Sequence, residues 1–305
     1  MSFPAPFSLR RWCMLALVAL AGTACGAGAT QSAKPAQTPL ASLAPSPSLP
    51  TTASPSPVAA PTQPHVFVIV MENRSYLQAI TGGYTASLAR DYGVATNYHG
   101  VTHPSLPNYL ALTSGSTWGV ADDGWHQLPA GGLGAQLNGA GIPWRAYMEG
   151  MGNGCFNSGY PYALKHNPFA YLGAACPSRV VPFTQFAADM SSASVPQFVW
   201  ITPGLCHDGH DCSTAVADAW LAQTVPEIMA TSAWKDGGVL FITWDEGEDS
   251  GNSVLTLVVR PNVAHATSSR RYDHYALLAT IEDQFGLQRL GAAADVWAMT
   301  DLMGS

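Results

Sequence analysis

The sequence is short of charge, and above all of positive charge. Only 11% of its 305 residues are charged, with 13 Lys and Arg against 20 Asp and Glu. The net charge of −7 and the lack of any longer Lys/Arg run exclude a protein that binds nucleic-acid backbones. The low charge, 29 glycines and 23 prolines exclude a coiled coil, whereas 10% aromatic residues argue against a disordered chain. The length suits one large domain or two small ones with a sizeable core.

The N-terminal residues lack an apolar run long enough to remain in a bilayer as a spanning helix. Two arginines precede an apolar run at 12–21, and small residues follow as far as Cys25. This layout predicts a bacterial export signal at 1–25. Its Ala-Cys ending is typical of a lipoprotein signal in which Cys25 is lipidated, but Gly22 stands where that pattern usually has leucine. Ordinary cleavage just before Cys25 therefore stays open, and we expect either a cell-surface lipoprotein or a secreted protein.

Residues 26–64 contain no acidic residue, no aromatic residue and no apolar periodicity, but a proline every few positions. Such a segment cannot bury enough apolar surface to offset its ordering entropy, so we expect a disordered tether. With this tether, the only membrane contact we expect is through a lipid at Cys25. The folded domain is then expected at 65–305, within the size range of a single α/β domain.

Four cysteines remain in the expected domain, and none has the C-x-x-C spacing of a structural zinc site. In an exported chain they predict two disulfides, although a zinc site is the competing interpretation. Of three possible connectivities, the sequence-local one minimises loop closure and is the one we expect. It pairs Cys155 with Cys176 and Cys206 with Cys212.

Apolar runs of strand length alternate with helical patterns along the domain. We expect strands within 65–73, 142–148, 196–203, 237–249 and 254–261, and helices at 105–115, 213–234 and 274–286. This alternation predicts an α/β fold with a mostly parallel central sheet and helices on both faces. Ligands bind such sheets at the carboxyl ends of the strands.

Two pairs of oxygen-bearing side chains stand where apolar strands are expected to stop. They are Glu72 with Asn73, and Asp245 with Glu246. Carboxylate and amide oxygens suit Mg²⁺, Ca²⁺ or Mn²⁺ and, together with histidine, Zn²⁺. A single acid after a strand is more often a helix cap or a solvated turn residue. Two such pairs at one edge of a sheet favour a divalent metal site.

Ser105 is a candidate nucleophile, because it stands where a loop enters a predicted helix. Backbone N–H groups at such a position can stabilise a phosphate or an oxyanion. A helix-capping serine is the alternative. The sequence has no G-x-S-x-G motif, which argues against an ordinary serine esterase, and a metal-activated serine fits the nearby carboxylates better.

Histidines supply the remaining candidates for the site, and each of them alone could be structural. The segment "CHDGHD" places two histidines and Asp208 inside the expected Cys206–Cys212 loop, which favours a phosphate or metal site. In mildly acidic medium, protonated histidines would neutralise a dianionic phosphate. The candidates for this role are His103, His166, His210 and His274.

Six segments in this order resemble the bacterial phosphoesterase family. They are "VIVMENRSY", "HPSLPNYLALTSG", "KHNPFAY", "CHDGHD", "FITWDEGED" and "YDHYALLATIEDQFGL". The resemblance covers roughly residues 65 to 293 and is far more specific than any single motif. That family contains secreted acid phosphatases, phosphatidylinositol-3-phosphatase-like enzymes and phospholipase C-type enzymes, and its fold is akin to that of alkaline phosphatase.

The resemblance implies roles for particular residues. It assigns Glu72, Asn73, Asp245 and Glu246 to a metal site, and the "PSLPN" loop resembles the segment that carries the Ser or Thr nucleophile in nucleotide pyrophosphatases. The histidine motif for a second metal is matched only loosely, because "HDGH" has a tighter spacing. One metal with histidines in the second place is therefore the alternative to two metals.

The sequence thus predicts an exported, metal-assisted phosphomonoesterase of the acid phosphatase kind, with Ser105 as nucleophile. Its partner would be a small phosphorylated substrate or a phospholipid headgroup, with phosphoinositides among the candidates. A phospholipase C-like phosphodiesterase is the alternative enzyme, and the short chain favours monoesters over it. A lipid-anchored protein that binds phosphate or metal is the alternative outside catalysis.

Overall fold

The computed structural model describes residues 64–304 of the chain. The expected export signal at 1–25, including Cys25, lies outside the described residues, as does the expected tether at 26–64 apart from its last residue. Among the residues described, no helix is both long and apolar enough to cross a membrane.

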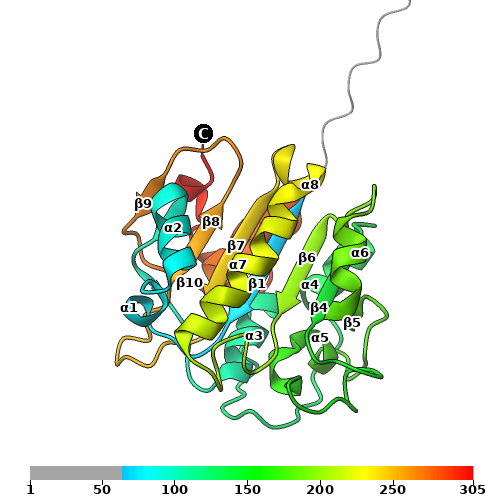
Figure 1. Cartoon of the computed structure of the whole chain (residues 1–305). Coiled ribbons are helices and arrows are strands. Elements are labelled where there is room, and N and C mark those ends of the chain that lie inside the picture. The colour runs from blue at the N-terminus through cyan, green and yellow to red at the C-terminus, as the bar shows by residue number, and fades with distance from the viewer. Residues whose placement is uncertain (1–63, 305) are drawn as a thin grey trace, which may run out of the picture. The chain divides into compact units, whose positions relative to one another are not determined.

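The domain is built on an eight-stranded sheet in the order β5-β4-β6-β1-β7-β8-β2-β9, flanked by helices (Figure 1). All neighbouring strands run parallel except at β8, which is antiparallel to β7 and to β2. The predicted mostly parallel α/β fold is therefore confirmed. The strands are β1 (Val66–Met71), β2 (Gly93–Ala95), β4 (Trp144–Met148), β5 (Val180–Pro182), β6 (Phe198–Thr202), β7 (Val239–Trp244), β8 (Thr256–Val259) and β9 (Ala266–Ser268). A separate pair consists of β3 (Tyr98–His99) and β10 (Tyr272–Asp273).

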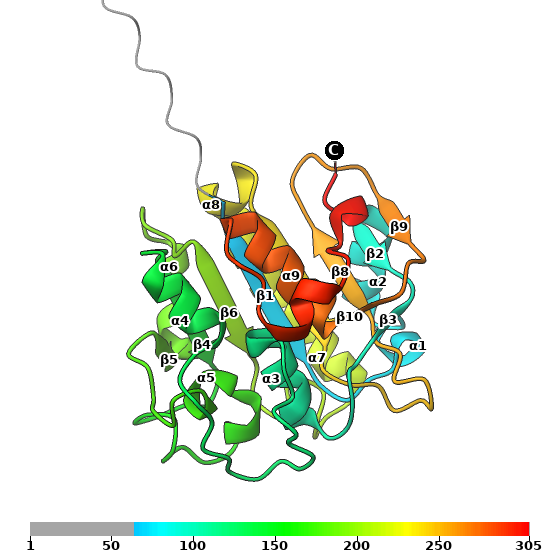
Figure 2. The ribbon, with the colours of Figure 1, turned by 180° about the vertical axis from the view of Figure 1, so that it is seen from behind.

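Helices cover both faces of the sheet, as Figures 1 and 2 show from opposite sides. On one face α7 packs against α2 and α6, and on the other α3 packs against α4, α5 and α9. The helices are α1 (Tyr76–Ala79), α2 (Gly83–Asp91), α3 (Ser105–Ser114), α4 (Gly132–Gly139), α5 (Pro168–Tyr171), α6 (Phe186–Met190), α7 (Thr214–Ala230), α8 (Ser232–Lys235) and α9 (His274–Phe285). Short 3₁₀ turns are η1 (Leu164–His166), η2 (Phe183–Gln185), η3 (Gly291–Asp295) and η4 (Thr300–Leu302).

The ends of the central strands β1 and β7 determine where the candidate functional residues lie. Every residue of both strands is buried, as expected for strands covered on both faces. Their parallel register pairs Val66 with Val239 and Met71 with Trp244. Glu72 and Asp245 therefore follow the last pair of the ladder at the same edge.

The helix predicted at 213–234 is in fact two helices, because Thr231 interrupts it. The backbone of Thr231 is extended, with φ −68° and ψ 150°, and ends α7. Its side chain then accepts a hydrogen bond from the Trp234 N–H and caps α8. A threonine that can cap a new helix competes with continuation of the old one, and the apolar periodicity does not reveal that competition.

Candidate active site

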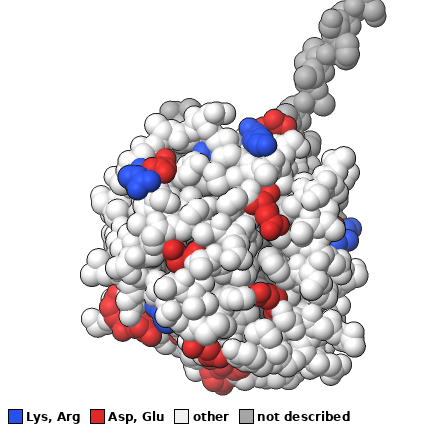
Figure 3. All heavy atoms as spheres, viewed as in Figure 1, with Lys and Arg blue, Asp and Glu red and all other residues white. Residues whose placement is uncertain are grey.

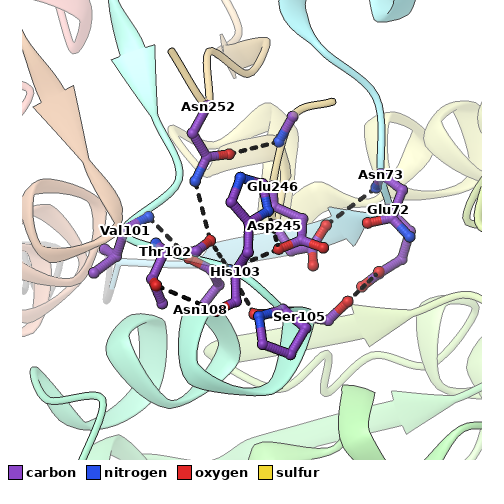
Figure 4. A network of polar contacts seen from close by, with 12 residues as sticks. Glu72, Asn73, Val101, Thr102, His103, Ser105, Asn108, Asp245, Glu246 and Asn252 are labelled. Atoms are coloured by element: carbon purple, nitrogen blue, oxygen red, sulfur yellow. Dashed lines mark hydrogen bonds and ion pairs between the residues drawn. The ribbon is translucent and has the colours of Figure 1, made fainter. Parts of the chain in front are cut away.

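The candidate site lies at the carboxyl edge of the sheet, where β1 and β7 end beside the N-terminus of α3 (Figure 4). A loop at 101–104 brings the start of α3 to this edge, and Asn108 holds that loop in place. Its Oδ1 accepts hydrogen bonds from the N–H groups of Val101 and Thr102, at 2.8 and 3.1 Å. Its Nδ2 donates to the carbonyl oxygens of Thr102 and Pro104. The first turn of α3 is thus fixed against the strand ends.

Ser105 is the first residue of α3, and its hydroxyl is not used to cap the helix. The N-cap position is occupied by Pro104, which makes no side-chain cap. Instead, Ser105 Oγ donates a hydrogen bond to Glu72 Oε2 across 3.1 Å, and Ser105 is almost fully buried. The capping explanation for Ser105 is therefore wrong. Its hydroxyl is directed at the acidic cluster.

Glu72, His166 and Asp208 form a buried cluster whose ligand atoms all lie within 4.8 Å of one another. His166 Nε2 is 3.2 Å from Glu72 Oε2, and His166 Nδ1 is 3.4 Å from Asp208 Oδ2. Within the described part of the chain, the two ring nitrogens of His166 and the Oδ2 atom of Asp208 make no hydrogen bond. Buried polar atoms are normally paired, so atoms that converge without pairing fit a shared metal ion.

Burial dominates the electrostatics of these acids. It raises the pKa of Glu72 well above 4.5, to which the nearby Asp245 and Asp208 add. Burial also raises the pKa of Asp208 from 3.8 to about 7 and that of Asp245 from 3.8 to about 8. Three buried acids at one edge repel one another unless a positive charge compensates them, which is the environment that a cation stabilises.

The three acids and the one amide predicted at the strand ends take different positions. Asp245 Oδ1 accepts the N–H of Asn73 at 3.2 Å, while its Oδ2 is buried without a hydrogen-bond partner among the described residues. Glu246 turns towards the other side, where its Oε2 lies 2.8 Å from His103 Nδ1 and 3.4 Å from Asn108 Nδ2. Asp245 therefore faces the cluster of Glu72, whereas Glu246 belongs to the rim with His103.

The histidines are also divided. His103 is exposed at the mouth of the site, two residues before Ser105, and is held by Glu246. His274 is fully buried behind the site, with Nδ1 bonded to the Tyr98 hydroxyl at 3.0 Å and Nε2 to the backbone oxygen of Asp245. The structure thus places His274 where it positions Asp245 and does not expose it towards a substrate.

Two of the four histidines that were candidates for a positive charge are buried, which disfavours their protonation. Burial lowers the pKa of His166 well below 6.5 and that of His274 to about 4. In the metal-free protein these two candidates are therefore unsuited to carry the positive charge that would neutralise a phosphate in mildly acidic medium. The physical reason is that a buried imidazolium loses its hydration, which the sequence pattern does not report.

The "CHDGHD" loop does not act as one unit. Only Asp208 enters the buried cluster, and its carbonyl oxygen accepts the N–H of Glu72 at 2.9 Å. His207 points away and contacts Glu149 at 2.8 Å. His210 lies at the edge, with Nδ1 2.7 Å from Asp211 and Nε2 3.2 Å from Lys165 Nζ.

Both disulfides have the sequence-local connectivity. Cys155 pairs with Cys176, and Cys206 pairs with Cys212. The second bond closes a loop over a separation of only six residues. Arg74 anchors this loop to the end of β1, because its guanidinium donates to the carbonyl oxygens of Cys212 and Asn73 at 2.8 and 2.6 Å. The disulfide thus fixes the segment that carries Asp208.

Three residues of the site were not identified from the sequence. The hydroxyl of Tyr109 donates to Glu72 Oε1, and its ring stacks on His166 with 5.1 Å between the centroids. Lys165 and Asp123 form an ion pair of 2.9 Å beside the N-terminal end of α3. Tyr109 could have been found, because it lies four residues after Ser105 on one helix face. Lys165 could have been found because it directly precedes the candidate His166, whereas nothing in the sequence pattern indicates Asp123.

The fold agrees with solved structures of the alkaline phosphatase superfamily. A member from Vibrio parahaemolyticus matches with a TM-score of 0.55 at 10% identity, over 79% of this chain and 72% of that one. A phosphonate monoester hydrolase of Agrobacterium radiobacter matches with a TM-score of 0.54 at 11% identity, over 79% of this chain and 78% of that one. At such identities the likeness shows the fold alone.

Sequence relatives are closer. A phosphatidylinositol-3-phosphatase of Mycobacterium tuberculosis is 32% identical over 259 residues, which are 81% of this chain and 85% of that protein. A phosphate-repressible acid phosphatase of Penicillium chrysogenum is 28% identical over 73% of this chain, which spans only 59% of the fungal protein. The sequence model of the Phosphoesterase family matches residues 78–288, which include Ser105, His166, Asp208 and Asp245. The chain belongs to the Phosphoesterase family.

Proposed function

We propose that the protein is an exported, metal-assisted phosphomonoesterase that uses Ser105 as its nucleophile. The observation that carries the proposal is the direction of the Ser105 hydroxyl. It donates to Glu72 Oε2 at 3.1 Å from the first turn of α3, next to a buried cluster suited to a cation. Hydrolysis of phosphoric esters is the chemistry of the family, and a serine so placed gives that chemistry a covalent route.

The residues at the cluster fit a divalent metal ion. Glu72, Asp208 and His166 would hold it, and Asp245 offers a further oxygen that is buried without a partner among the described residues. One nitrogen and several oxygen donors favour Zn²⁺ or Mn²⁺ over Ca²⁺ or Mg²⁺. Such an ion would supply Lewis-acid stabilisation of the developing negative charge and would lower the pKa of a nearby hydroxyl.

The protein's own groups would then carry the reaction. Ser105 Oγ, oriented by Glu72, would attack phosphorus in line while its proton passes along the hydrogen bond to Glu72 and the bond to the leaving alcohol breaks, which leaves a phosphoseryl group and the free alcohol. His103 is exposed at the mouth and paired with Glu246, so it is placed to give a proton to the departing oxygen. Water would then attack phosphorus and give a proton to His103, while Glu72 returns a proton to Ser105 Oγ, so that inorganic phosphate is released and both groups are restored.

The names of the relatives support a monoester as substrate. Two relatives are named as phosphatases, a phosphatidylinositol-3-phosphatase and an acid phosphatase, and both are similar to this chain over more than 70% of its length. We therefore infer a small phosphomonoester or a phosphoinositide headgroup as substrate. A phospholipase C-like phosphodiesterase is the second enzyme hypothesis. Export through residues 1–25 and a lipid at Cys25 stay proposals that rest on the sequence pattern.

The test compares the wild type with Ser105→Ala on phosphomonoesters, phosphodiesters and phosphoinositides, with metal analysis of both proteins. We expect turnover of monoesters that Ser105→Ala lowers by at least about 10³-fold while metal content is kept. Ser114→Ala, at the other end of α3, is the matched control and should keep its activity. Turnover unchanged in Ser105→Ala would overturn the nucleophile, and phosphate binding without turnover in the wild type would favour the binding protein instead.

A further inference from the structure

Lys165 places an ammonium group beside the acidic cluster without pairing with any member of it. It lies in η1 directly before His166, and its side chain is largely buried. Its Nζ lies 2.9 Å from Asp123 Oδ2 and 3.2 Å from His210 Nε2. Its positive charge nevertheless acts on the cluster: it lowers the pKa values of Glu72 and Asp208, although burial has the larger, opposite effect.

Asp123 links this ammonium to the helix that carries the nucleophile. Its Oδ1 accepts the N–H of Leu106 at 3.0 Å, and its Oδ2 accepts the bond from Lys165. Leu106 directly follows Ser105, and the N-cap of α3 is Pro104, which has no capping side chain. One carboxylate from a distant loop thus occupies an N–H group of the first helical turn and a lysine at the same time.

A phosphoryl group at Ser105 would need donors of these two kinds. A phosphate at the N-terminus of a helix is stabilised by its backbone N–H groups and by a nearby cation. A second cation near the site, Arg74, is held by the carbonyl oxygens of Asn73 and Cys212 and by Thr214. Lys165 is therefore the better placed cation for a charged substrate.

We infer that Asp123 is an internal anion that occupies the phosphoryl-binding donors, Leu106 N–H and Lys165 Nζ, until a substrate displaces it. The inference rests on the proposed function, to which it adds Lys165 as a catalytic residue that contacts the phosphoryl oxygens. Trp125, two residues further on, packs on Phe156 and Tyr171 with centroids 5.0 and 4.9 Å apart. The loop is thereby anchored, so only the Asp123 carboxylate has to move.

Competition by an internal carboxylate weakens the binding of every phosphate, including the product. The enzyme would gain release of inorganic phosphate at the expense of ground-state affinity, which raises turnover when product release limits the rate. Asp123 then lowers affinity although it contacts the same helix that binds the substrate. A residue that only caps α3 or only positions Lys165 would have the opposite effect.

The experiment measures the Kd of inorganic phosphate by calorimetry and its Ki against an aryl phosphate, using the full metal-loaded chain. In Asp123→Asn both constants should fall by about threefold or more, and in Lys165→Met both should rise about tenfold or more. Lys165→Arg should recover part of the loss. The matched controls are Asp122→Asn, which removes an exposed acid bonded to His126 and Gly124, and Lys235→Met, which removes the lysine of α8. Both controls should leave the two constants unchanged.

A phosphate affinity that is weakened or unchanged in Asp123→Asn overturns the inference, as does an unchanged affinity in Lys165→Met. Asp123→Ser removes the charge but keeps an acceptor for the Leu106 N–H, so it replaces Asp123→Asn should that variant not fold. Calorimetry separates the two proposals. A wild type that binds phosphate without hydrolysing esters contradicts the proposed function, while tighter binding in Asp123→Asn would still support the internal anion. If the wild type hydrolyses esters but both Asp123 variants bind phosphate less tightly than the wild type does, the internal anion alone is contradicted.

Discussion

His166 Nε2 lies 3.2 Å from Glu72 Oε2, yet the two groups do not form a hydrogen bond. The imidazole is buried and kept neutral, and the pKa of the carboxyl group is raised well above 4.5. Neither partner is therefore stabilised by the other in the metal-free protein. An imidazole and a carboxylate at this separation are instead arranged as two ligands that face a common point.

Glu72→Gln should remove metal and activity together. A neutral amide keeps the volume, and its single oxygen can still accept the hydroxyl of either Ser105 or Tyr109, so the fold is expected to survive with one hydrogen bond lost. It lacks the charge that a cation needs, and we expect metal affinity to fall by about two orders of magnitude or more, with kcat/KM following it. Metal analysis after dialysis and steady-state kinetics measure the two effects.

The matched control for that variant is Glu282→Gln, because Glu282 is also a buried acid but lies on α9 and accepts the N–H of Leu290. It should keep its metal and its kcat. Full activity of the wild type after complete chelation would contradict a role for the metal in the reaction.

The metal-free protein should lose stability as the pH rises. Burial raises the pKa of Asp208 and of Glu246 to about 7 and that of Asp245 to about 8, from 3.8, 4.5 and 3.8 respectively. Between about pH 4 and pH 8 the folded state therefore holds protons that the unfolded chain has released. Below about pH 6.5 the lowered pKa values of His166 and His274 act in the opposite sense, but the buried acids outnumber them. The free energy of unfolding should therefore fall across the window, most steeply between about pH 6.5 and pH 8.

Urea denaturation of the chelated protein at pH 5, 6, 7 and 8 measures this trend. A saturating divalent metal should flatten or reverse it, because ligation needs deprotonated carboxylates and becomes stronger as the pH rises. A chelated protein that gains stability from pH 5 to pH 8 would mean that these acids are already paired with positive charge.

The apolar runs were enough to predict the mostly parallel sheet and five of its eight strands, namely β1, β4, β6, β7 and β8. The strands β2, β5 and β9 were missed, because three residues are too few to show a pattern. Glu72 and Asp245 could be placed at one edge because both directly follow such a run. The antiparallel direction of β8 could not be predicted, because the apolar run at 254–261 reads the same in either direction. The break at Thr231 was missed for a similar reason, since capping depends on a backbone turn that periodicity does not record.

Roles inside the site were harder to predict than its location. Side-chain type made four histidines candidates for contact with a phosphate, but the packing buries two of them, His166 with the acids and His274 behind Asp245. Burial decides whether an imidazole is a cation, a ligand or a positioning group, and burial is a tertiary property. Asp123 shows the limit most clearly, because its contact with Leu106 joins a loop to a helix 17 residues away.

His103→Asn should slow the hydrolysis of some esters more than that of others, depending on whether the leaving group needs a proton. If His103 protonates the departing oxygen, alkyl phosphates should lose about 10²- to 10⁴-fold in kcat/KM, while nitrophenyl phosphate should lose far less because its leaving group needs no proton. His126→Asn is the matched control, since His126 is also bonded to an acid, Asp122, at 2.7 Å. Equal losses on both substrates would assign His103 to binding and not to proton transfer.

The disulfide between Cys206 and Cys212 should matter more for the metal than for the fold. It closes a loop over six residues, so the chain-entropy relation gives a contribution of only about 2–3 kcal/mol to the free energy of unfolding. The same loop carries Asp208 into the cluster. In the double variant Cys206→Ser with Cys212→Ser, we therefore expect a folded domain whose metal affinity and kcat/KM fall by about tenfold or more.

The double variant Cys155→Ser with Cys176→Ser provides the contrast. Its larger loop, with a separation of 21 residues, should cost slightly more stability, about 3 kcal/mol. That loop contains His166, but stacking on Tyr109 holds the imidazole independently of the cysteines. We expect this variant to denature at a lower urea concentration and yet to keep most of its metal affinity, as measured by calorimetry under native conditions. If metal affinity instead falls in parallel with stability in both variants, the small loop does not position Asp208, and its disulfide acts only through the stability of the whole domain.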